Sequence, residues 1–256
     1  MKFPQPTSHL AHDYRALVKR WKAFARGAGL KLRPFARSGD EELYVMVTSE
    51  SVARTGVPYV YISAGVHGDE PAPPWGLLDW AETHAELLKR HPFILFPTLN
   101  PTGLILNTRA DHRGQDLNRS FNLPDQPVVE AWRTVVGDRS MSLGLCLHED
   151  YDGQGCYVYE LNAGPKILGT SILQDTSRII PSDGRRTIDG RRAKEGLIRR
   201  RIPPEMPGHP EAIVLHLLGA PIALTFESPS EFSIAERIAV QRAFIESSLK
   251  HALGIS

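Results

Sequence analysis

The sequence predicts an α/β fold, a single domain over residues 1–256 with a twisted, mixed and mostly parallel sheet covered by helices on both faces. Two observations predict it. Short apolar runs rich in β-branched and aromatic residues alternate with stretches of helical periodicity, which is typical of a sheet whose strands are joined by helices. The chain also contains no internal repeat and no stretch with the composition of a linker, so nothing divides it into two domains.

In chain order, residues 9–27 have apolar residues near helical spacing and end at glycines, which predicts a helix. Residues 43–49 and 59–64 are β-branched and aromatic runs bounded by Gly, Pro and Ser, which predicts strands. After a turn rich in Gly and Pro, an amphipathic pattern over residues 75–90 predicts a second helix, and residues 91–100 predict another buried strand.

The second half begins with a long polar segment, residues 101–127, which has too many Gly, Asn, Pro and Asp residues for a regular element. Because a loop of that length inside a compact domain is usually functional or mobile, it is a candidate for the substrate side of a site. The remaining elements are expected in the order helix 128–136, strand 143–149, strand 155–162, helix 164–175, strand 220–228 and helix 231–251.

Composition excludes several classes of protein. A chain of 256 residues with 41% hydrophobic and 23% charged residues can bury a core and is not of the disordered type. A net charge of +1 gives no general reason to bind nucleic acid or an anionic membrane, and no apolar run approaches the ~20 residues that span a bilayer. The amino-terminal residues lack the apolar segment of a secretory signal, and two cysteines cannot form a disulfide framework. We therefore expect a cytoplasmic protein, of an oligomeric state that the sequence does not indicate.

Three of the predicted strands run into ionisable residues. The strand at 59–64 is followed by His67 and Glu70, and two later strands end at His148 and at Glu227. In open α/β sheets, ligand sites lie in the crevice outside the carboxyl ends of the strands. We therefore expect these four side chains to converge at one edge of the sheet.

His67, Glu70 and His148 have the composition of a catalytic zinc site, in which two histidines and one glutamate leave the fourth position to water. Zinc lowers the pKa of such a water and polarises a carbonyl. Glu227 directly follows an apolar run, where a carboxylate is costly unless it is paired, and a general base beside the metal is one natural use. The alternative is a surface turn with an incidental His and Glu, and a buried histidine that only satisfies its hydrogen bonds.

The long polar segment carries candidates for substrate binding. The planar fork of Arg119 suits bidentate binding of a carboxylate, and Asn118 can donate to the same oxygens. Asp116 can accept from the distal N–H of a ligating histidine, which fixes its tautomer. The alternative is a surface loop in which Arg109, Arg119 and the other arginines are simply solvated.

The motifs resemble those of the zinc carboxypeptidase superfamily, which includes pancreatic carboxypeptidases, bacterial murein-peptide amidases and the aspartoacylase/succinylglutamate desuccinylase branch. They cover most of residues 58–230 and occur in the order of that family. The matching pieces are His-Gly-Asp-Glu at 67–70, Asn-Pro-Thr-Gly at 100–103, Thr-Arg at 108–109, Asp-Leu-Asn-Arg-Ser-Phe at 116–121, His-Glu-Asp at 148–150 and Thr-Phe-Glu-Ser-Pro at 225–229. Residues 148–161 further resemble a small bacterial carboxypeptidase-like subgroup.

The resemblance implies a zinc-carboxypeptidase-like fold and a set of roles. His67, Glu70 and His148 would bind one zinc ion per chain. Glu227 would be the general base and acid, and Arg109 would stabilise the developing oxyanion.

On the substrate side, the resemblance implies that Asn118 and Arg119 hold a terminal carboxylate and that Asp116 orients His67. The implied function is that of a zinc metallocarboxypeptidase, which releases a C-terminal amino acid from peptides. Two alternatives stay open. The same site can serve a murein-peptide amidase or an N-acyl amino acid deacylase, and the fold can also serve as a catalytically inactive module that binds carboxylates or peptides.

Two regions depart from that pattern or lie outside it. The peptidase members use a mobile tyrosine some two dozen residues before the general base, but none of the seven tyrosines here lies between residues 160 and 227. Either another residue serves, or none does, as in the deacylase branch; the candidates are Tyr151, Tyr157, Tyr159, Glu205 and His209. Residues 185–201 hold eight basic and two acidic residues, and form either a solvated flexible connector or a rim that selects acidic substrates.

Overall fold

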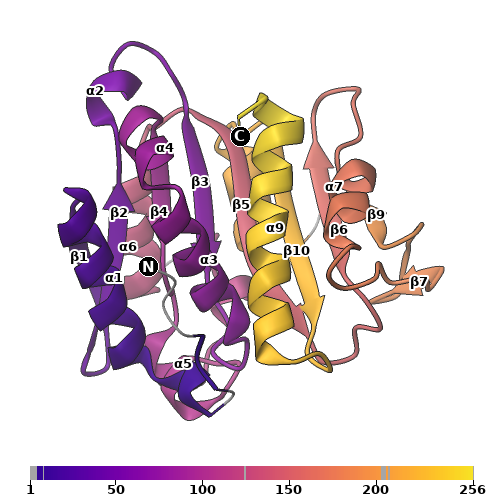
Figure 1. The fold of residues 1–256 in the computed structure, drawn as a ribbon, viewed down its shortest axis with the longest axis horizontal. Coiled ribbons are helices and arrows are strands. Elements are labelled where there is room, and N and C mark those ends of the chain that lie inside the picture. Colours follow the sequence, from indigo (N-terminus) through magenta and orange to yellow (C-terminus); the bar gives the residue numbers. More distant parts are fainter. Residues whose placement is uncertain (1–4, 8, 124, 203–205, 207, 256) are drawn as a thin grey trace.

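A computed structural model describes residues 5–7, 9–123, 125–202, 206 and 208–255. Its centre is an eight-stranded sheet in the order β1-β2-β4-β3-β5-β10-β6-β9 (Figure 1). Neighbouring strands are parallel from β4 through β3 and β5 to β10 and again between β6 and β9, and antiparallel elsewhere. The strands are β1 (Leu32–Ser38), β2 (Glu41–Val47), β3 (Tyr59–Ala64), β4 (Phe93–Phe96), β5 (Met141–Asp150), β6 (Tyr157–Asn162), β9 (Leu197–Arg199) and β10 (Ile222–Pro229). A separate hairpin pairs β7 (Thr187–Ile188) with β8 (Arg191–Arg192).

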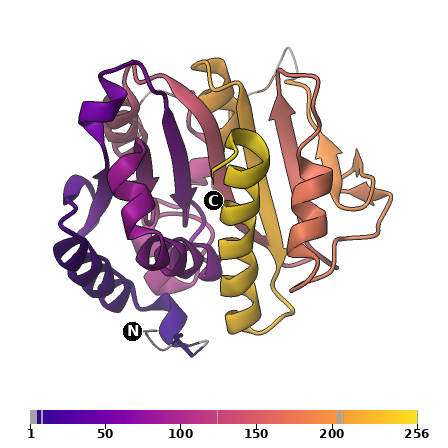
Figure 2. The same cartoon turned by 45° about the horizontal axis from the view of Figure 1, so that its top comes forward.

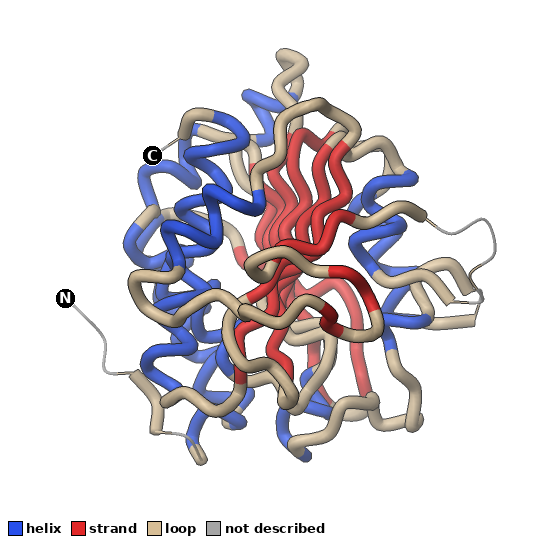
Figure 3. The backbone as a smooth tube through the Cα atoms, turned by 90° about the vertical axis from the view of Figure 1, so that its right-hand side faces the viewer, coloured by secondary structure: helices blue, strands red, loops and turns tan. Residues whose placement is uncertain are grey.

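Helices cover both faces of the sheet, and Figure 3 shows them on either side of the twisted strands. One face carries α1 (Tyr14–Ala28), α3 (Ala72–Thr83), α4 (Ala85–Arg90), α7 (Gly169–Thr176) and α9 (Ile234–Leu253). The other carries α6 (Pro127–Val136) and α8 (Glu211–Leu217). Short elements complete the chain, namely η1 (Leu10–His12), α2 (Glu50–Ala53), α5 (Pro101–Leu106) and η2 (Leu117–Arg119). The predicted α/β fold class, with its mixed, mostly parallel sheet, is confirmed.

The sheet separates two hydrophobic cores because successive strand residues point to opposite faces. On β5, Leu145 and Leu147 pack under α3 and α9, whereas Cys146 faces the core under α6 and α8. Figures 1 and 2 show α9 lying along the middle of the sheet between α3 and α7. Phe244 of α9 stacks on Phe226 of β10 with ring centres 4.4 Å apart. Side chains on the α6 and α8 face are therefore the ones that are free to reach a site beyond the strand ends.

The predicted elements that differ in extent do so for local reasons. α9 begins at Ile234 because Ser233 and Glu236 form a capping box. α7 begins at Gly169, later than expected, because the buried carboxylate of Glu160 accepts from the backbone N–H groups of Leu168 and Gly169. The helix expected over residues 75–90 starts earlier and is interrupted at His84, so that it forms α3 and α4.

Two interpretations of loops are corrected. The prediction that residues 101–127 hold no regular element is wrong, because Asn100 caps α5 through its side chain and Asp116 caps η2 in the same way. Asn and Asp side chains are common both in loops and at helix caps, so the same residues that predicted a loop cap these two elements. The basic residues 185–201 form β7, β8 and β9 rather than an irregular connector. Sequence periodicity also gave no sign of β1 or α8.

Two glycines hold the carboxyl end of β3 against α5. A Cβ on Gly68 would lie 1.9 Å from the backbone of Gly103. The His-Gly-Asp-Glu and Asn-Pro-Thr-Gly motifs are therefore in backbone contact at this point. Gly65, just after β3, has φ +61° and turns the chain toward His67. Within the described residues, no helix combines the length and hydropathy that a membrane crossing requires.

Candidate active site

The carboxyl ends of β3, β5 and β10 bring together the ionisable residues that the sequence singled out. His67 follows β3, His148 lies near the end of β5, and Glu227 is directly opposite His148 in the parallel register of β10. His67, Glu70 and His148 each offer a ligand atom, and these atoms lie within 4.8 Å of one another. All three side chains are buried, with residue exposures of 2–3%. The structure therefore forms the His–Glu–His cluster that the strand pattern predicts.

The carboxylate of Glu70 lies between the two imidazoles. Its Oε1 is 2.5 Å from Nδ1 of His67, and its Oε2 is 2.9 Å from Nδ1 of His148. That Oε2 is nevertheless a buried oxygen that accepts no hydrogen bond of normal geometry. Ligand atoms this close together, one of them without a hydrogen bond, are what residues show when they can surround a cation. Two imidazole nitrogens and a carboxylate oxygen also match the donor set of catalytic zinc, so these residues fit such an ion.

The protonation equilibria of the cluster reflect burial and the shared carboxylate. Burial lowers the pKa of His148 and outweighs the opposing charge of Glu70, which favours the neutral, ligating imidazole. For His67 burial also lowers the pKa, but the carboxylates of Glu70 and Asp116 outweigh it and raise the pKa to about 9. Burial raises the pKa of Glu70, yet both histidines hold it below the ordinary range, so this carboxyl is ionised. Without a cation, a proton on His67 takes its place.

Asp116 orients His67 from outside the cluster. Its Oδ1 is 3.2 Å from Nε2 of His67, which leaves Nδ1 to face Glu70 and His148. The same carboxylate caps η2 and accepts from Nε of Arg109 at 3.0 Å. Arg109 in turn has Nη1 3.3 Å from Nδ1 of His67, so its guanidinium lies beside the cluster. One aspartate therefore positions both a ligand candidate and the arginine next to it.

Glu227 lies on the cavity side of β10. Its strand neighbour Phe226 points to the opposite face and stacks on α9, so alternation places Glu227 and Thr225 toward the site. Burial raises the pKa of the Glu227 carboxyl well above its usual range, and the negative charges of Glu70 and Asp150 add to the effect. A carboxylate with a raised pKa is a stronger base, which suits proton transfer beside a metal.

Asn118 and Arg119 stand on the other side of the site. The amide of Asn118 is buried, and its Oδ1 accepts from the backbone N–H of Glu211 at 3.0 Å, which leaves its NH₂ group to donate elsewhere. Arg119 is exposed, and its Nη1 donates to the carbonyl of Asn118. Both residues line the same cavity as His67 and Glu227.

That cavity has a volume of about 550 Å³ and is walled by residues from several segments of the chain. Tyr157 and Tyr159 line it from β6, where they alternate with Val158 as predicted, and their hydroxyls donate to Asp150 and Asp189. Tyr151 is 59% exposed and lies outside the cavity lining.

Two other residues were candidates to replace the mobile tyrosine of the peptidases. His209 does not line the cavity, and Glu205 lies outside the described residues.

Sequence reasoning missed Glu211, the first residue of α8. It is 1% exposed, accepts hydrogen bonds from Tyr61 and Ser63 of β3, and holds Asn118 through its backbone N–H. An acidic residue after a proline and before an apolar run is the ordinary sign of a helix start, so nothing local indicated burial. The individual cavity-lining residues Thr225, Arg191 and Arg200 were missed as well.

Comparison with known proteins supports the same family. Residues 56–141, about a third of the chain, match the model of the succinylglutamate desuccinylase/aspartoacylase catalytic domain. Murein peptide amidase A of Escherichia coli strain K12 is 35% identical over 85 residues, which are 32% of this chain and 34% of that protein. The alignment thus spans about a third of the length of this relative.

Solved structures show the fold over nearly the whole chain. A Shewanella amazonensis SB2B protein proposed to be a metallopeptidase has a TM-score of 0.82 at 21% identity, covering 98% of this chain and 99% of that one. The resemblance to the zinc carboxypeptidase superfamily is confirmed. Among its carboxypeptidases, carboxypeptidase A of Helicoverpa armigera has a TM-score of 0.71 at 14% identity over 95% and 74% of the chains. A metallo-carboxypeptidase of Burkholderia cenocepacia has a TM-score of 0.70 at 16% identity over 93% and 68%. The chain thus has the fold of the metallocarboxypeptidases.

Proposed function

We propose that this protein is a zinc-dependent hydrolase that removes a C-terminal amino acid from peptides. The observation that carries the proposal is the buried cluster of His67, Glu70 and His148, whose Glu70 oxygen accepts no hydrogen bond. It lies beside a carboxyl of raised pKa, Glu227, in the same cavity as Arg119. Metal ligands, a proton acceptor and a carboxylate-binding group are what hydrolysis next to a free carboxylate requires.

The chain's own residues supply the other steps. His67, Glu70 and His148 would hold one zinc ion per chain, which would supply a Lewis acid for the scissile carbonyl and lower the pKa of a water molecule. Glu227 accepts the proton of the attacking water and delivers it to the leaving amine nitrogen. Arg109, held by Asp116, donates to the oxyanion that develops on the carbonyl oxygen.

The substrate's position follows from the opposite wall. Asn118 and Arg119 bind the α-carboxylate of the residue to be released, in a charge-assisted and bidentate geometry for Arg119. Asn118 is suited to donate, since its oxygen is already engaged by Glu211. The substrate is then placed with its last amide bond between the metal cluster and Glu227.

A second function uses the same groups, namely a murein-peptide amidase or an N-acyl amino acid deacylase. The match to the desuccinylase/aspartoacylase model and the similarity to murein peptide amidase A favour it. So does the absence of any tyrosine between residues 160 and 227. Each of these reactions also cleaves an amide next to a carboxylate, so the same residues serve.

One screen distinguishes these functions. The zinc-loaded protein is offered peptides with free C-termini, the same peptides amidated, murein peptides and N-acyl amino acids, with Glu227→Gln as the matched control. Release of a C-terminal residue by the wild type alone supports the carboxypeptidase. Preference for murein peptides or N-acyl amino acids supports the second function, and binding without turnover supports an inactive binding module.

We also propose a reducing location such as the cytoplasm. Cys146 and Cys156 are both buried and unpaired, which fits a compartment where thiols persist.

A further inference from the structure

One wall of the active-site cavity is made of arginines. Arg119 ends η2, Arg191 begins β8 and Arg200 directly follows β9, and all three line the cavity. We call these three residues the arginine wall. Within the described part of the chain, no carboxylate lies at ion-pair distance from any of their guanidinium groups.

Arg200 is the member for which the lack of a partner costs most. It is half-buried, its guanidinium lies 5.7 Å from the ring centre of Tyr159, and its Nη2 makes only a 4.0 Å contact with the sulfur of Met206. Its Nε is a buried donor without an acceptor. A buried N–H without a partner is destabilising, and a bound acceptor removes that cost.

The members of the wall also repel one another. Burial lowers the pKa of Arg200, and the positive charges of Arg191 and Arg119 lower it further. Like charges around one cavity raise the free energy of the empty site, and an anion between them neutralises that repulsion.

Two acidic residues that line the cavity, Asp150 and Asp189, accept hydrogen bonds from tyrosines rather than from the arginine wall. Tyr157 donates to Asp150 at 2.9 Å, and Tyr159 donates to Asp189 at 2.6 Å. Tyr159 thus has its hydroxyl on a carboxylate while its ring contacts Arg200. These two carboxylates therefore have partners of their own, whereas the arginine wall has no carboxylate partner among the described residues.

Two other arginines of the same segment are exposed to solvent and differ from the arginine wall in their position. Arg192 and Arg199, the neighbours of Arg191 and Arg200 in sequence, are exposed and do not line the cavity. Strand alternation sends adjacent side chains to opposite sides, so each strand contributes one arginine to the cavity and one to solvent.

We propose that the arginine wall binds a second carboxylate, carried by the side chain of the amino acid that is released. This rests on the proposed function, in which Asn118 and Arg119 hold the α-carboxylate of that residue. Arg200 and Arg191 bind the side-chain carboxylate, and the leaving residue is an acidic amino acid. The basic stretch 185–201 is thereby assigned to substrate selection.

The first test measures binding without turnover. The zinc-loaded protein is titrated by calorimetry with glutamate and glutamine, and with aspartate and asparagine, which are pairs of one shape that differ in charge. The acid of at least one pair should bind about 10-fold or more tightly than its amide, as expected for hydrogen bonds to a charged group. Equal affinities within both pairs, or no detectable binding of any of the four, would overturn the proposal.

Matched variants locate the effect. Arg200→Gln should reduce the acid-to-amide ratio to within about 3-fold, whereas Arg199→Gln, on the solvent side of the same strand, should leave it unchanged. Thermal unfolding shows whether Arg200→Gln folds, and Arg191→Gln, at an exposed position, provides a second variant of the wall. A ratio that both wall variants leave at the wild-type value contradicts the assignment.

Hydrolysis separates this proposal from the proposed function. With N-acyl dipeptides that end in Glu or Gln, Arg200→Gln should lower kcat/KM about 10–100-fold for the first and less than about 3-fold for the second. Turnover of both peptides at equal rates by the wild type overturns the acidic preference and leaves the hydrolase standing. Charge-selective binding without any hydrolysis would support the arginine wall and contradict the proposed hydrolase.

Discussion

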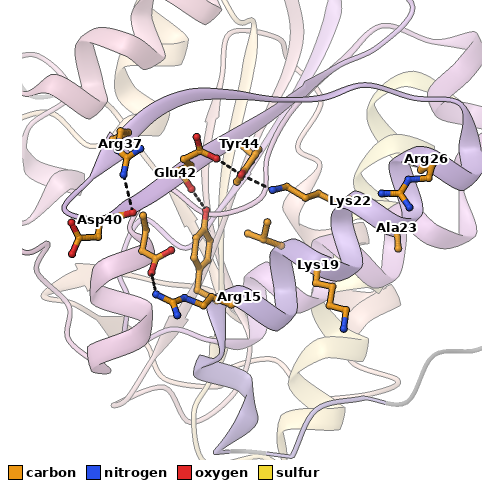
Figure 4. A pocket seen from close by; sticks show the side chains of 12 residues that line it. Arg15, Lys19, Lys22, Ala23, Arg26, Arg37, Asp40, Glu42 and Tyr44 are labelled. Carbon is orange, nitrogen blue, oxygen red and sulfur yellow. Dashed lines mark hydrogen bonds and ion pairs between the residues drawn. The ribbon is translucent and has the colours of Figure 1, made fainter.

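Two cavities of similar size differ in how their charged groups are satisfied. The first, of about 660 Å³, lies between α1 and the β1–β2 hairpin toward one edge of the sheet. Figure 4 shows that several of its polar groups are paired with one another, whereas Lys19 and Arg26 point away without a partner among the residues drawn. Arg15 pairs with Glu41 at 3.2 Å, and Lys22 donates to the hydroxyl of Tyr44 at 2.8 Å.

The cavity beside the His–Glu–His cluster is smaller, about 550 Å³, and two of its lining residues have a buried polar atom without a hydrogen bond. Glu70 has a buried oxygen without a hydrogen bond, and Arg200 has a buried nitrogen in the same state. Within the described residues, none of the side chains that line the first cavity has a buried polar atom of this kind. The comparison teaches that buried polar atoms without partners, rather than cavity volume, distinguish the candidate site from the other cavity.

The largest expected effect removes a metal ligand. His67→Ala or His148→Ala should lower the zinc content from about one per chain to near zero and abolish hydrolysis, because three protein ligands define a catalytic site. Lys22→Ala in the α1 cavity is the control and should retain both. Elemental analysis measures the metal. Zinc content at the wild-type level in both histidine variants would contradict the assignment of His67 and His148 as metal ligands.

Next in size is the loss of the general base. Glu227→Gln is nearly isosteric but cannot take a proton from water, so kcat should fall by about 10²-fold or more while zinc content stays unchanged. Steady-state kinetics measure the fall in kcat, and elemental analysis measures the zinc content. Near-normal kcat would mean that the base lies elsewhere.

Arg119→Ala tests how the cavity binds the terminal carboxylate. We expect kcat/KM to fall by roughly 10²–10³, equivalent to about 3–4 kcal/mol, without loss of zinc. Amidating the substrate's C-terminus should cost the wild type a similar factor and the variant little more. Efficient cleavage of amidated peptides by the wild type would contradict both the carboxypeptidase and the deacylase.

The smallest effect concerns stability rather than activity. Burial raises the pKa of Glu211 from 4.5 to about 7, and the hydrogen bonds from Tyr61 and Ser63 only partly oppose it. The folded state therefore holds a proton that the unfolded state releases, so the free energy of unfolding falls as pH rises from about 4.5 to 7. The contribution of this group is on the order of 3 kcal/mol.

Glu211→Gln mimics the protonated carboxyl and should remove that part of the pH dependence. Denaturant unfolding at pH 5 and pH 8 should show a smaller difference for the variant than for the wild type. An unchanged difference would mean that Glu211 keeps an ordinary pKa.

The sequence by itself determined most of the fold and the His–Glu–His cluster. Strands that end in ionisable residues predicted His67, Glu70, His148 and Glu227 at one edge of the sheet, because parallel strands end on the same side. β3, β5 and β10 are neighbours in the sheet, so the structure brings all four residues together. Apolar periodicity is a local signal and needs no knowledge of distant contacts.

The tertiary structure decided what depends on contacts between distant segments. Asn118 is held by Glu211, and position 68 has no room for a side chain because the backbone of Gly103 lies against it; neither dependence can be read from spacing. The pairing of β9 with β6 likewise decided that Arg200 faces the cavity and Arg199 faces solvent. A strand's alternation is visible in sequence only when one face is apolar, and in a run of arginines both faces look alike. Only the folded sheet could therefore place one of them in the cavity.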